Sequence, residues 1–122
     1  MRYKVWYDAA NHLVRAEVLE SLTKEDAGDM MMKIEAELLK NGTRLGIMDL
    51  SNAGSIKKVS KETREVYKEH AKRLSLDRAA VIVDSPVLRM IARVALTALG
   101  QSGTAKFVKS ETEALKWLKS KK

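Results

Sequence analysis

The spacing of apolar residues changes near Thr23, and this change limits the possible folds more than any other feature of the chain. Upstream of it, apolar residues occupy every second position in two short runs that flank a turn-forming segment at residues 8–11: Tyr3, Val5 and Tyr7, then Val14, Ala16 and Val18. Such alternation is typical of half-buried strands. It predicts a β-hairpin that opens the domain, with Lys4 and Trp6 on the opposite face of its first strand.

Downstream of Thr23 the apolar spacing becomes helical. Thr23 is suited to cap a helix, and Asn41 and Gly42 are suited to end it. The residues between them recur at intervals of three and four positions: Ala27, Met30, Met31, Ile34 and Leu38. This pattern predicts an amphipathic helix that buries Met30 and Met31 and leaves Met32 exposed.

Beyond this helix, the chain alternates strands with helices. We expect strands at residues 45–50, 79–83 and 104–108, and helices at 59–74, at 87–99 and after a capping box formed by Ser110 and Glu113. The order ββαβαβαβα implies right-handed crossovers in a mainly parallel sheet of sequential strands. The predicted fold class is therefore α/β, with an N-terminal antiparallel hairpin and helices packed on the sheet.

Length and composition predict one globular domain over residues 1–122, with a basic, frayed tail at 119–122. The chain has no cysteine, which excludes disulfides, thiolate metal ligands and a cysteine nucleophile. Two histidines leave little for a metal site, so we expect no metal and no cofactor. No apolar run has the roughly 20 residues of a membrane span, and none resembles a signal peptide, so we expect a cytoplasmic protein.

The net charge of +7 would suit an anionic partner such as nucleic acid, a phosphate ligand or an acidic membrane surface. Part of this excess comes from the terminal lysines, and the helix at 59–74 mixes both signs of charge on its polar faces. Aromatic residues are also too few for a base-stacking platform. Electrostatic binding of nucleic acid is therefore the least favoured alternative.

Three segments resemble the SpoIIAA-like branch of the STAS superfamily of sulfate transporters and anti-sigma factor antagonists. They are the strand "LGIMDLS", the strand-turn-helix "AAVIVDSPVLRMIARVAL" and, most specifically, the ending "AKFVKSETEALKWL". The resemblance implies a stack of β-α units that regulates other proteins or holds an apolar or anionic small ligand. Lipid-carrying domains of the CRAL-TRIO, or Sec14, type share the same general fold.

The chain departs from this family where the anti-sigma antagonists carry an Asp-Ser-Ser-Gly-like motif with a phosphorylated serine. The corresponding stretch reads "SIKKVSKET", with lysines in place of the acid and the serine. Ser60 is placed to cap the next helix, whereas Ser51 and Ser55 belong to the polar segment before it. Whether any of these serines is phosphorylated is left open, and the resemblance does not make Ser60 the phosphoacceptor.

Two predicted strand ends carry an acid and a serine each: Asp49 with Ser51, and Asp84 with Ser85. Ligands of parallel α/β sheets gather outside the carboxyl ends of the strands, so these residues would converge on a ligand if the strands are neighbours. The alternative, which we favour, is that they only cap turns.

Arg89 and Arg93 lie one turn apart on an otherwise apolar helix. They are the best candidates to contact an anion, because each guanidinium offers a planar fork of donors. The alternative is that they reach solvent or pair with nearby acids.

The leading functional hypothesis is a non-enzymatic STAS-like regulatory or ligand-binding module. It would bind an amphipathic or anionic small molecule, or a lipid, through the four strand-end residues and the two arginines. The second hypothesis is a protein-interaction domain without a phosphoserine switch, either a homodimer or a partner of another protein, that uses Trp6 and the sheet edge of the hairpin. Motifs for nucleotide binding, hydrolase chemistry and zinc proteolysis are absent from the sequence, so nothing positive supports an enzyme.

Overall fold

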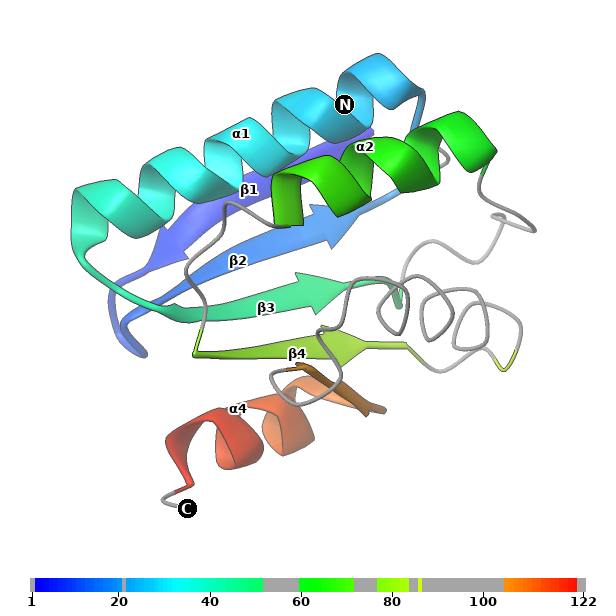
Figure 1. The fold of residues 1–122 in the computed structure, drawn as a ribbon. Coiled ribbons are helices and arrows are strands. Elements are labelled where there is room, and N and C mark those ends of the chain that lie inside the picture. The colour runs from blue at the N-terminus through cyan, green and yellow to red at the C-terminus, as the bar shows by residue number, and fades with distance from the viewer. Residues whose placement is uncertain are drawn as a thin grey trace.

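The computed structural model describes residues 2–20, 22–51, 60–71, 77–83, 86 and 105–120 (Figure 1). Its elements follow the predicted order, apart from the helix expected at 87–99, which lies outside the described residues. They are β1 (Tyr3–Asp8), β2 (Leu13–Val18), α1 (Lys24–Asn41), β3 (Leu45–Asp49), α2 (Lys61–Ala71), β4 (Arg78–Ile82), β5 (Ala105–Val108) and α4 (Glu111–Lys119).

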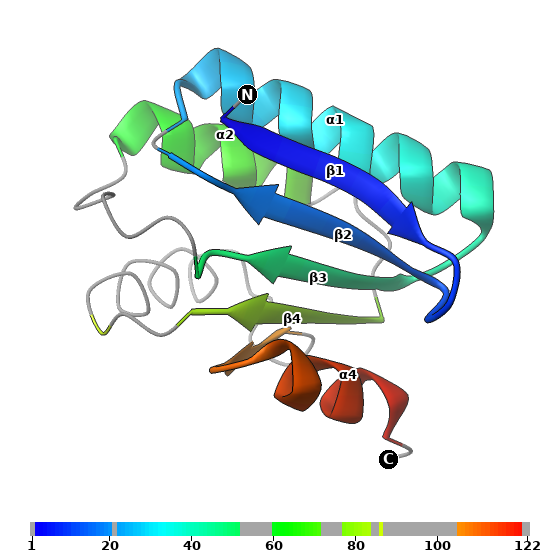
Figure 2. The same ribbon diagram turned by 180° about the vertical axis from the view of Figure 1, so that it is seen from behind.

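The strands form one sheet in the sequential order β1-β2-β3-β4-β5, as the sequence predicts. β1 and β2 pair antiparallel in the register that places Trp6 opposite Arg15, and every later pair is parallel. This order leaves β1 at one edge of the sheet (Figure 2).

The described helices cover both faces of the sheet, with α1 and α2 on one side and α4 on the other (Figure 1). Alternate residues of each strand therefore enter different cores. Val14, Ala16 and Val18 of β2 pack with the buried residues of α1. Leu13 packs on the other face with a group from β3, β4, β5 and α4: Ile47, Ala80, Ile82, Val108, Ala114 and Leu118.

Helix α1 begins and ends as its sequence predicts. The Thr23 hydroxyl accepts a hydrogen bond from the Asp26 amide at 3.1 Å, which satisfies one of the free donors of the first turn. Gly42 ends the helix with φ 62°, a left-handed conformation that favours glycine. The apolar stripe that was read from the sequence is buried throughout: Ala27, Met30, Met31, Ile34 and Leu38.

The last helix, α4, is fixed at both ends by polar contacts. Ser110 caps its start by accepting from the Glu113 amide at 3.2 Å, although the return bond to Glu113 comes from the Lys109 amide and not from Ser110. At the other end, Arg78 donates to the Trp117 carbonyl oxygen at 2.7 Å. The predicted tail begins too early, because Lys119 is the last residue of α4 and donates to the Asn11 side chain at 2.6 Å.

Gly28 within α1 and Gly42, which caps its C-terminus, give a matched test of this description. A Cβ added at Gly28 would lie 3.6 Å from Val66 and 3.7 Å from His70, which is ordinary contact, whereas Gly42 has a positive φ. We therefore expect Gly28→Ala to stabilise the fold by about 0.5–1 kcal/mol. Gly42→Ala should destabilise it by about 1–2 kcal/mol, because a side chain is strained in the left-handed region. Urea unfolding measures the change in the free energy of unfolding for each variant. Changes of the same sign in the two variants would contradict the described geometry.

Candidate functional site

Asp49 and Ser51, the two predicted ligand-site residues that lie in the described part of the chain, form a closed turn. One carboxylate oxygen of Asp49 accepts both the Ser51 amide at 2.9 Å and the Ser51 hydroxyl at 2.5 Å. This is the local bonding by which aspartate stabilises a turn at the end of a strand. The contacts favour the capping interpretation for these two residues.

The strands that carry the predicted site are neighbours, as the ligand hypothesis requires. β3 pairs in parallel with β4, Asp49 lies opposite Ile82, and the ladder continues from the Leu50 amide to the Ile82 carbonyl oxygen at 2.8 Å. The carboxyl ends of the two strands therefore lie side by side at the same end of the sheet. The other predicted site residues lie outside the described part of the chain, and their role stays a prediction: Asp84, Ser85, Arg89 and Arg93.

Among the described residues, no group of three or more histidine, aspartate or glutamate side chains could hold a metal ion. The helices of the described segments include none that is long and apolar enough to cross a membrane. Ser60 caps α2 by accepting from the Thr63 amide at 3.1 Å, which is the capping role that its position predicts.

The open edge of β1 is the clearest exposed binding feature of the described surface. Because the Leu19 amide donates to the Arg2 carbonyl oxygen at 2.8 Å, Arg2 and Leu19 form a hydrogen-bonded pair. Bonded and non-bonded pairs alternate along an antiparallel ladder, so Lys4, Trp6 and Asp8 also direct their backbone groups toward β2. The residues between them direct their N–H and C=O groups away from β2, toward the free edge: Tyr3, Val5 and Tyr7.

The outward backbone groups have no partner within the described segments. Beside them stands Trp6, whose side chain is 40% exposed. A row of free donors and acceptors flanked by an exposed aromatic ring is a template for another extended chain.

Two further large apolar side chains are exposed on α1: Met32, as predicted, and Leu39, which the sequence analysis did not single out. They lie four and eleven positions after Gly28, which faces Val66 and His70 of α2. Helical spacing places all three on the flank of α1 toward α2. They are therefore not continuous with the edge of β1.

A group of charged side chains fixes the position of β1. The Arg15 side chain is only 13% exposed, and its guanidinium bonds Asp8 at 2.8 Å and also bonds Glu111 of α4. The hydrogen bond from the Asn11 side chain and then the bond from Arg15 lower the pKa of Asp8, although burial opposes them. Burial would lower the pKa of Arg15, but its bonds to Asp8 and Glu111 outweigh burial and raise it. Both groups therefore stay charged over the physiological range.

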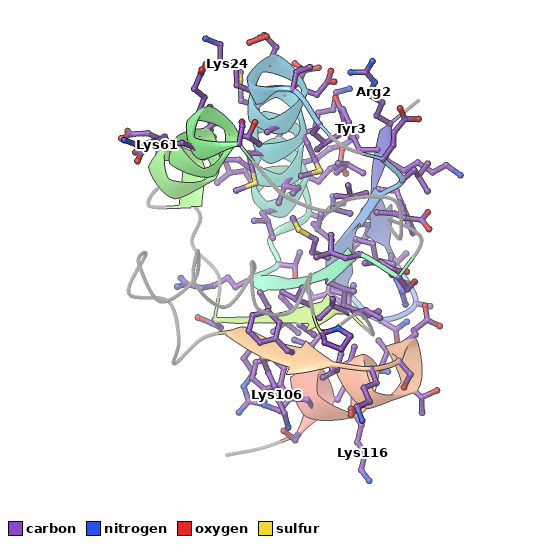
Figure 3. The ribbon with its side chains drawn as sticks, turned by 90° about the vertical axis from the view of Figure 1, so that its right-hand side faces the viewer. Arg2, Tyr3, Lys24, Lys61, Lys106 and Lys116 are labelled. Carbon is purple, nitrogen blue, oxygen red and sulfur yellow. The ribbon has the colours of Figure 1, made fainter. Side chains whose placement is uncertain are left out.

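The start of β1 is tied to α1 by a second polar group. The Tyr3 hydroxyl donates to Asp29 at 3.0 Å and accepts from Lys33 at 3.0 Å, and Arg2 donates to Asp26 at 3.0 Å. The bond to Tyr3 raises the pKa of Lys33. Figure 3 shows Arg2 and Tyr3 together beside the first turns of α1.

His12 has a partner in the hairpin. Its Nδ1 lies 2.5 Å from the Tyr7 hydroxyl, and the two rings meet edge to face. His12 also has φ 54°, an unusual backbone conformation for a residue other than glycine. The two side chains meet because a tight turn reverses the strand, which apolar spacing alone does not reveal.

The sheet order, the antiparallel first hairpin and the packing of the helices are those of a SpoIIAA-like fold. A family model described as "Domain of unknown function (DUF7793)" matches residues 20–122, so the chain belongs to that family. No curated protein matches the chain closely enough in sequence to count as a relative.

Solved structures share the fold at low sequence identity. One is an uncharacterised protein of the DUF3478 family with a SpoIIAA-like fold from Shewanella loihica PV-4, with a TM-score of 0.70 and 19% identity over 95% of this chain and 91% of that one. Another is TM1081 of Thermotoga maritima, described as a candidate anti-sigma factor antagonist, with a TM-score of 0.66 and 16% identity over 97% of this chain and 95% of that one. An NMR structure of TM1081 gives a TM-score of 0.67.

The largely buried pair of Asp8 and Arg15 predicts a pH-dependent contribution to stability. Asp8→Asn should cost about 1–3 kcal/mol at neutral pH, because it weakens charged hydrogen bonds that are shielded from water. The pKa of Asp8 is lowered from its usual 3.8, so this contribution is complete above that value and disappears as the pH falls through the folded-state pKa. Urea unfolding of the wild-type chain and of Asp8→Asn, repeated from neutral to acid pH, should show that the difference between their free energies of unfolding becomes smaller as the pH falls.

Asp77 is the matched control, because its pair with Arg44 is exposed, with 62% and 60% of the two side chains accessible. Asp77→Asn should change the neutral-pH stability by less than about 0.5 kcal/mol. Equal losses for the two variants would show that burial does not strengthen the Asp8 pair.

Proposed function

We propose that this chain is a non-enzymatic regulatory module that acts by binding a protein along the open edge of β1. The observation that carries the proposal is the row of backbone groups at Tyr3, Val5 and Tyr7, which have no partner among the described residues and lie beside the exposed Trp6. Backbone hydrogen bonds would supply affinity, and the aromatic side chain would supply a buried contact at the centre of the interface.

The polar contacts of the hairpin support this proposal, because they hold the edge in a fixed shape. Arg15 joins β2 to the end of β1 and to α4, and Tyr3 joins the start of β1 to α1. A strand held at both ends loses little conformational freedom on binding, which reduces the entropic cost of association. The structural similarity to a candidate anti-sigma factor antagonist also supports a protein partner, by analogy of fold alone.

A small-molecule or lipid site at the carboxyl ends of β3 and β4 stays a second candidate. The adjacency of the two strands favours it. Native mass spectrometry of the protein purified from its host tests it: a retained amphipathic ligand that Asp49→Ala releases would support this site. A protein that carries no ligand, and whose melting temperature no anionic amphiphile shifts, would exclude it.

Nucleic-acid binding has less support. The labelled lysines lie at opposite ends of the molecule, with Lys24 and Lys61 beside α1 and α2 and Lys106 and Lys116 beside α4 (Figure 3). These four lysines do not form one continuous basic stripe. A steep loss of affinity with rising salt would be the signature of this alternative.

A photoreactive phenylalanine analogue tests the proposed interface in living cells. Placed at Trp6, it should give one defined adduct in the native host, and the partner is then named by mass spectrometry. Val5→Pro should abolish this adduct, because proline removes the outward amide at the centre of the edge. It should leave the ladder to β2 intact, because proline is tolerated on an edge strand when its nitrogen faces away from the sheet.

The same analogue at Leu39 is the control, since this side chain is 79% exposed but lies on the other flank of α1. An adduct with the analogue at Leu39, but none with the analogue at Trp6, would show that the partner binds α1 and not the edge of β1. An adduct at Trp6 that Val5→Pro leaves unchanged would reject pairing along the edge.

A further inference from the structure

The geometry points to a second copy of this chain as the partner of β1, paired antiparallel about a two-fold axis through Val5. This inference deepens the proposed function and rests on it. In this register Tyr3 faces Tyr7 of the second copy, and Val5 faces its own equivalent.

The register follows from the alternation of the backbone groups. Tyr3, Val5 and Tyr7 all point their N–H and C=O groups outward, so each facing pair can exchange two hydrogen bonds. A shift by two residues in either direction leaves the outward groups of Tyr3 or Tyr7 without partners. A shift by one residue places outward groups against groups that already bond β2. Centring on Val5 is therefore the register that uses the whole edge.

Charge along β1 selects a copy that runs antiparallel. The strand is preceded by Arg2 and includes the exposed Lys4, and it ends at Asp8. Arg2 and Asp8 also pair within their own copy, with Asp26 and Arg15. The register centred on Val5 brings Arg2 opposite Asp8 of the second copy. It also brings Lys4 opposite the exposed Trp6, an arrangement suited to a cation–π contact. A parallel copy would place like charges together.

The helices above the edge fit the same arrangement. α1 packs on residues of both β1 and β2, and the inferred arrangement takes its axis to run above these two strands. Two edges paired at the usual strand spacing would place the two α1 axes about 10 Å apart, close to the distance at which helices pack. The extended sheet would therefore carry a pair of adjacent helices on one face.

The facing flanks of the two helices also have complementary charge. Asp29 and Lys33 mark the flank toward β1, because both bond the Tyr3 hydroxyl, and Glu37 follows Lys33 by one helical turn. α1 runs in the same direction as β1, so the axis through Val5 passes between Lys33 and Glu37. Lys33 of one copy then comes level with Glu37 of the other.

Mixed disulfide formation between two variants of the full chain tests the register directly. The chain has no cysteine, so Lys4→Cys and Trp6→Cys each carry one thiol. In the inferred register these positions form a non-hydrogen-bonded pair with Cα atoms about 4.5 Å apart, within reach of a disulfide. The two copies of residue 4, or the two copies of residue 6, lie diagonally across the strand pair at about 7–8 Å. This distance is too long for a disulfide unless the backbone moves.

Oxidation of an equimolar mixture of the purified variants should therefore give the mixed disulfide about tenfold above either symmetric one. Mass spectrometry separates the three products. Random collision would give only a two-to-one excess, and that ratio, or a majority of symmetric products, would overturn the register. Lys116 is an exposed residue of α4, far from the inferred interface. A mixture of the Lys116→Cys variant with either β1 variant therefore measures the yield of mixed disulfide that random collision gives.

Sedimentation provides the second measurement. The wild-type chain should sediment as a dimer and Val5→Pro as a monomer with unchanged circular dichroism. A wild-type chain that is monomeric at every accessible concentration would overturn the self-pairing. It would leave the proposed function intact if the photoreactive analogue at Trp6 still captures a different protein in cells.

Discussion

The antiparallel register of β1 on β2 decides what the outer edge of this molecule offers to a partner. The bond from the Leu19 amide to Arg2 fixes which residues of β1 face inward, and from there the alternation determines the rest. A slip by one residue would exchange the two faces of the strand, burying Trp6 and exposing Tyr3, Val5 and Tyr7. The apolar packing of the hairpin against α1 makes that slip costly.

The polar contacts explain why an edge strand of this kind can stay ordered. Edge strands are often short or irregular, because a free ladder invites unwanted pairing. Here Arg15 connects Asp8 to Glu111, and the Tyr3 hydroxyl connects β1 to Asp29 and Lys33. These bonds join the strand to helices on both faces of the sheet. The edge is therefore presented as a rigid surface, and its charges limit which partners can align with it.

The sequence predicts most of the fold because its local signals agree with one another. Period-two spacing gives the hairpin, helical spacing and two caps give α1, and the repeated β-α order gives the parallel sheet. Long-range polar contacts are harder to predict: Arg15 and Glu111 lie far apart in the chain, and no periodicity links them. The boundary of the basic tail was missed for a related reason, since Lys119 is held in α4 by a contact with Asn11 of the hairpin.

The candidate site shows the same limit. Acids and serines at strand ends indicate either a ligand site or a turn, and only the bonds between Asp49 and Ser51 separate these interpretations for the described pair. The edge of β1 was suggested by the hairpin, but its outward groups could be identified only once the register was known. Leu39 was missed because it directly follows Leu38, which belongs to the buried stripe, and a step of one residue turns the side chain by more than a quarter of a turn around the helix.

Hydrogen exchange at single amides of β1, followed by NMR as the protein concentration rises, tests the central claim most directly. The amides of Lys4, Trp6 and Asp8 should be protected at every concentration, because they bond β2. Those of Tyr3, Val5 and Tyr7 should exchange freely in dilute solution and become protected together as the concentration increases. Uniform protection along β1 in dilute solution, or outward amides whose exchange does not depend on concentration, would contradict the account.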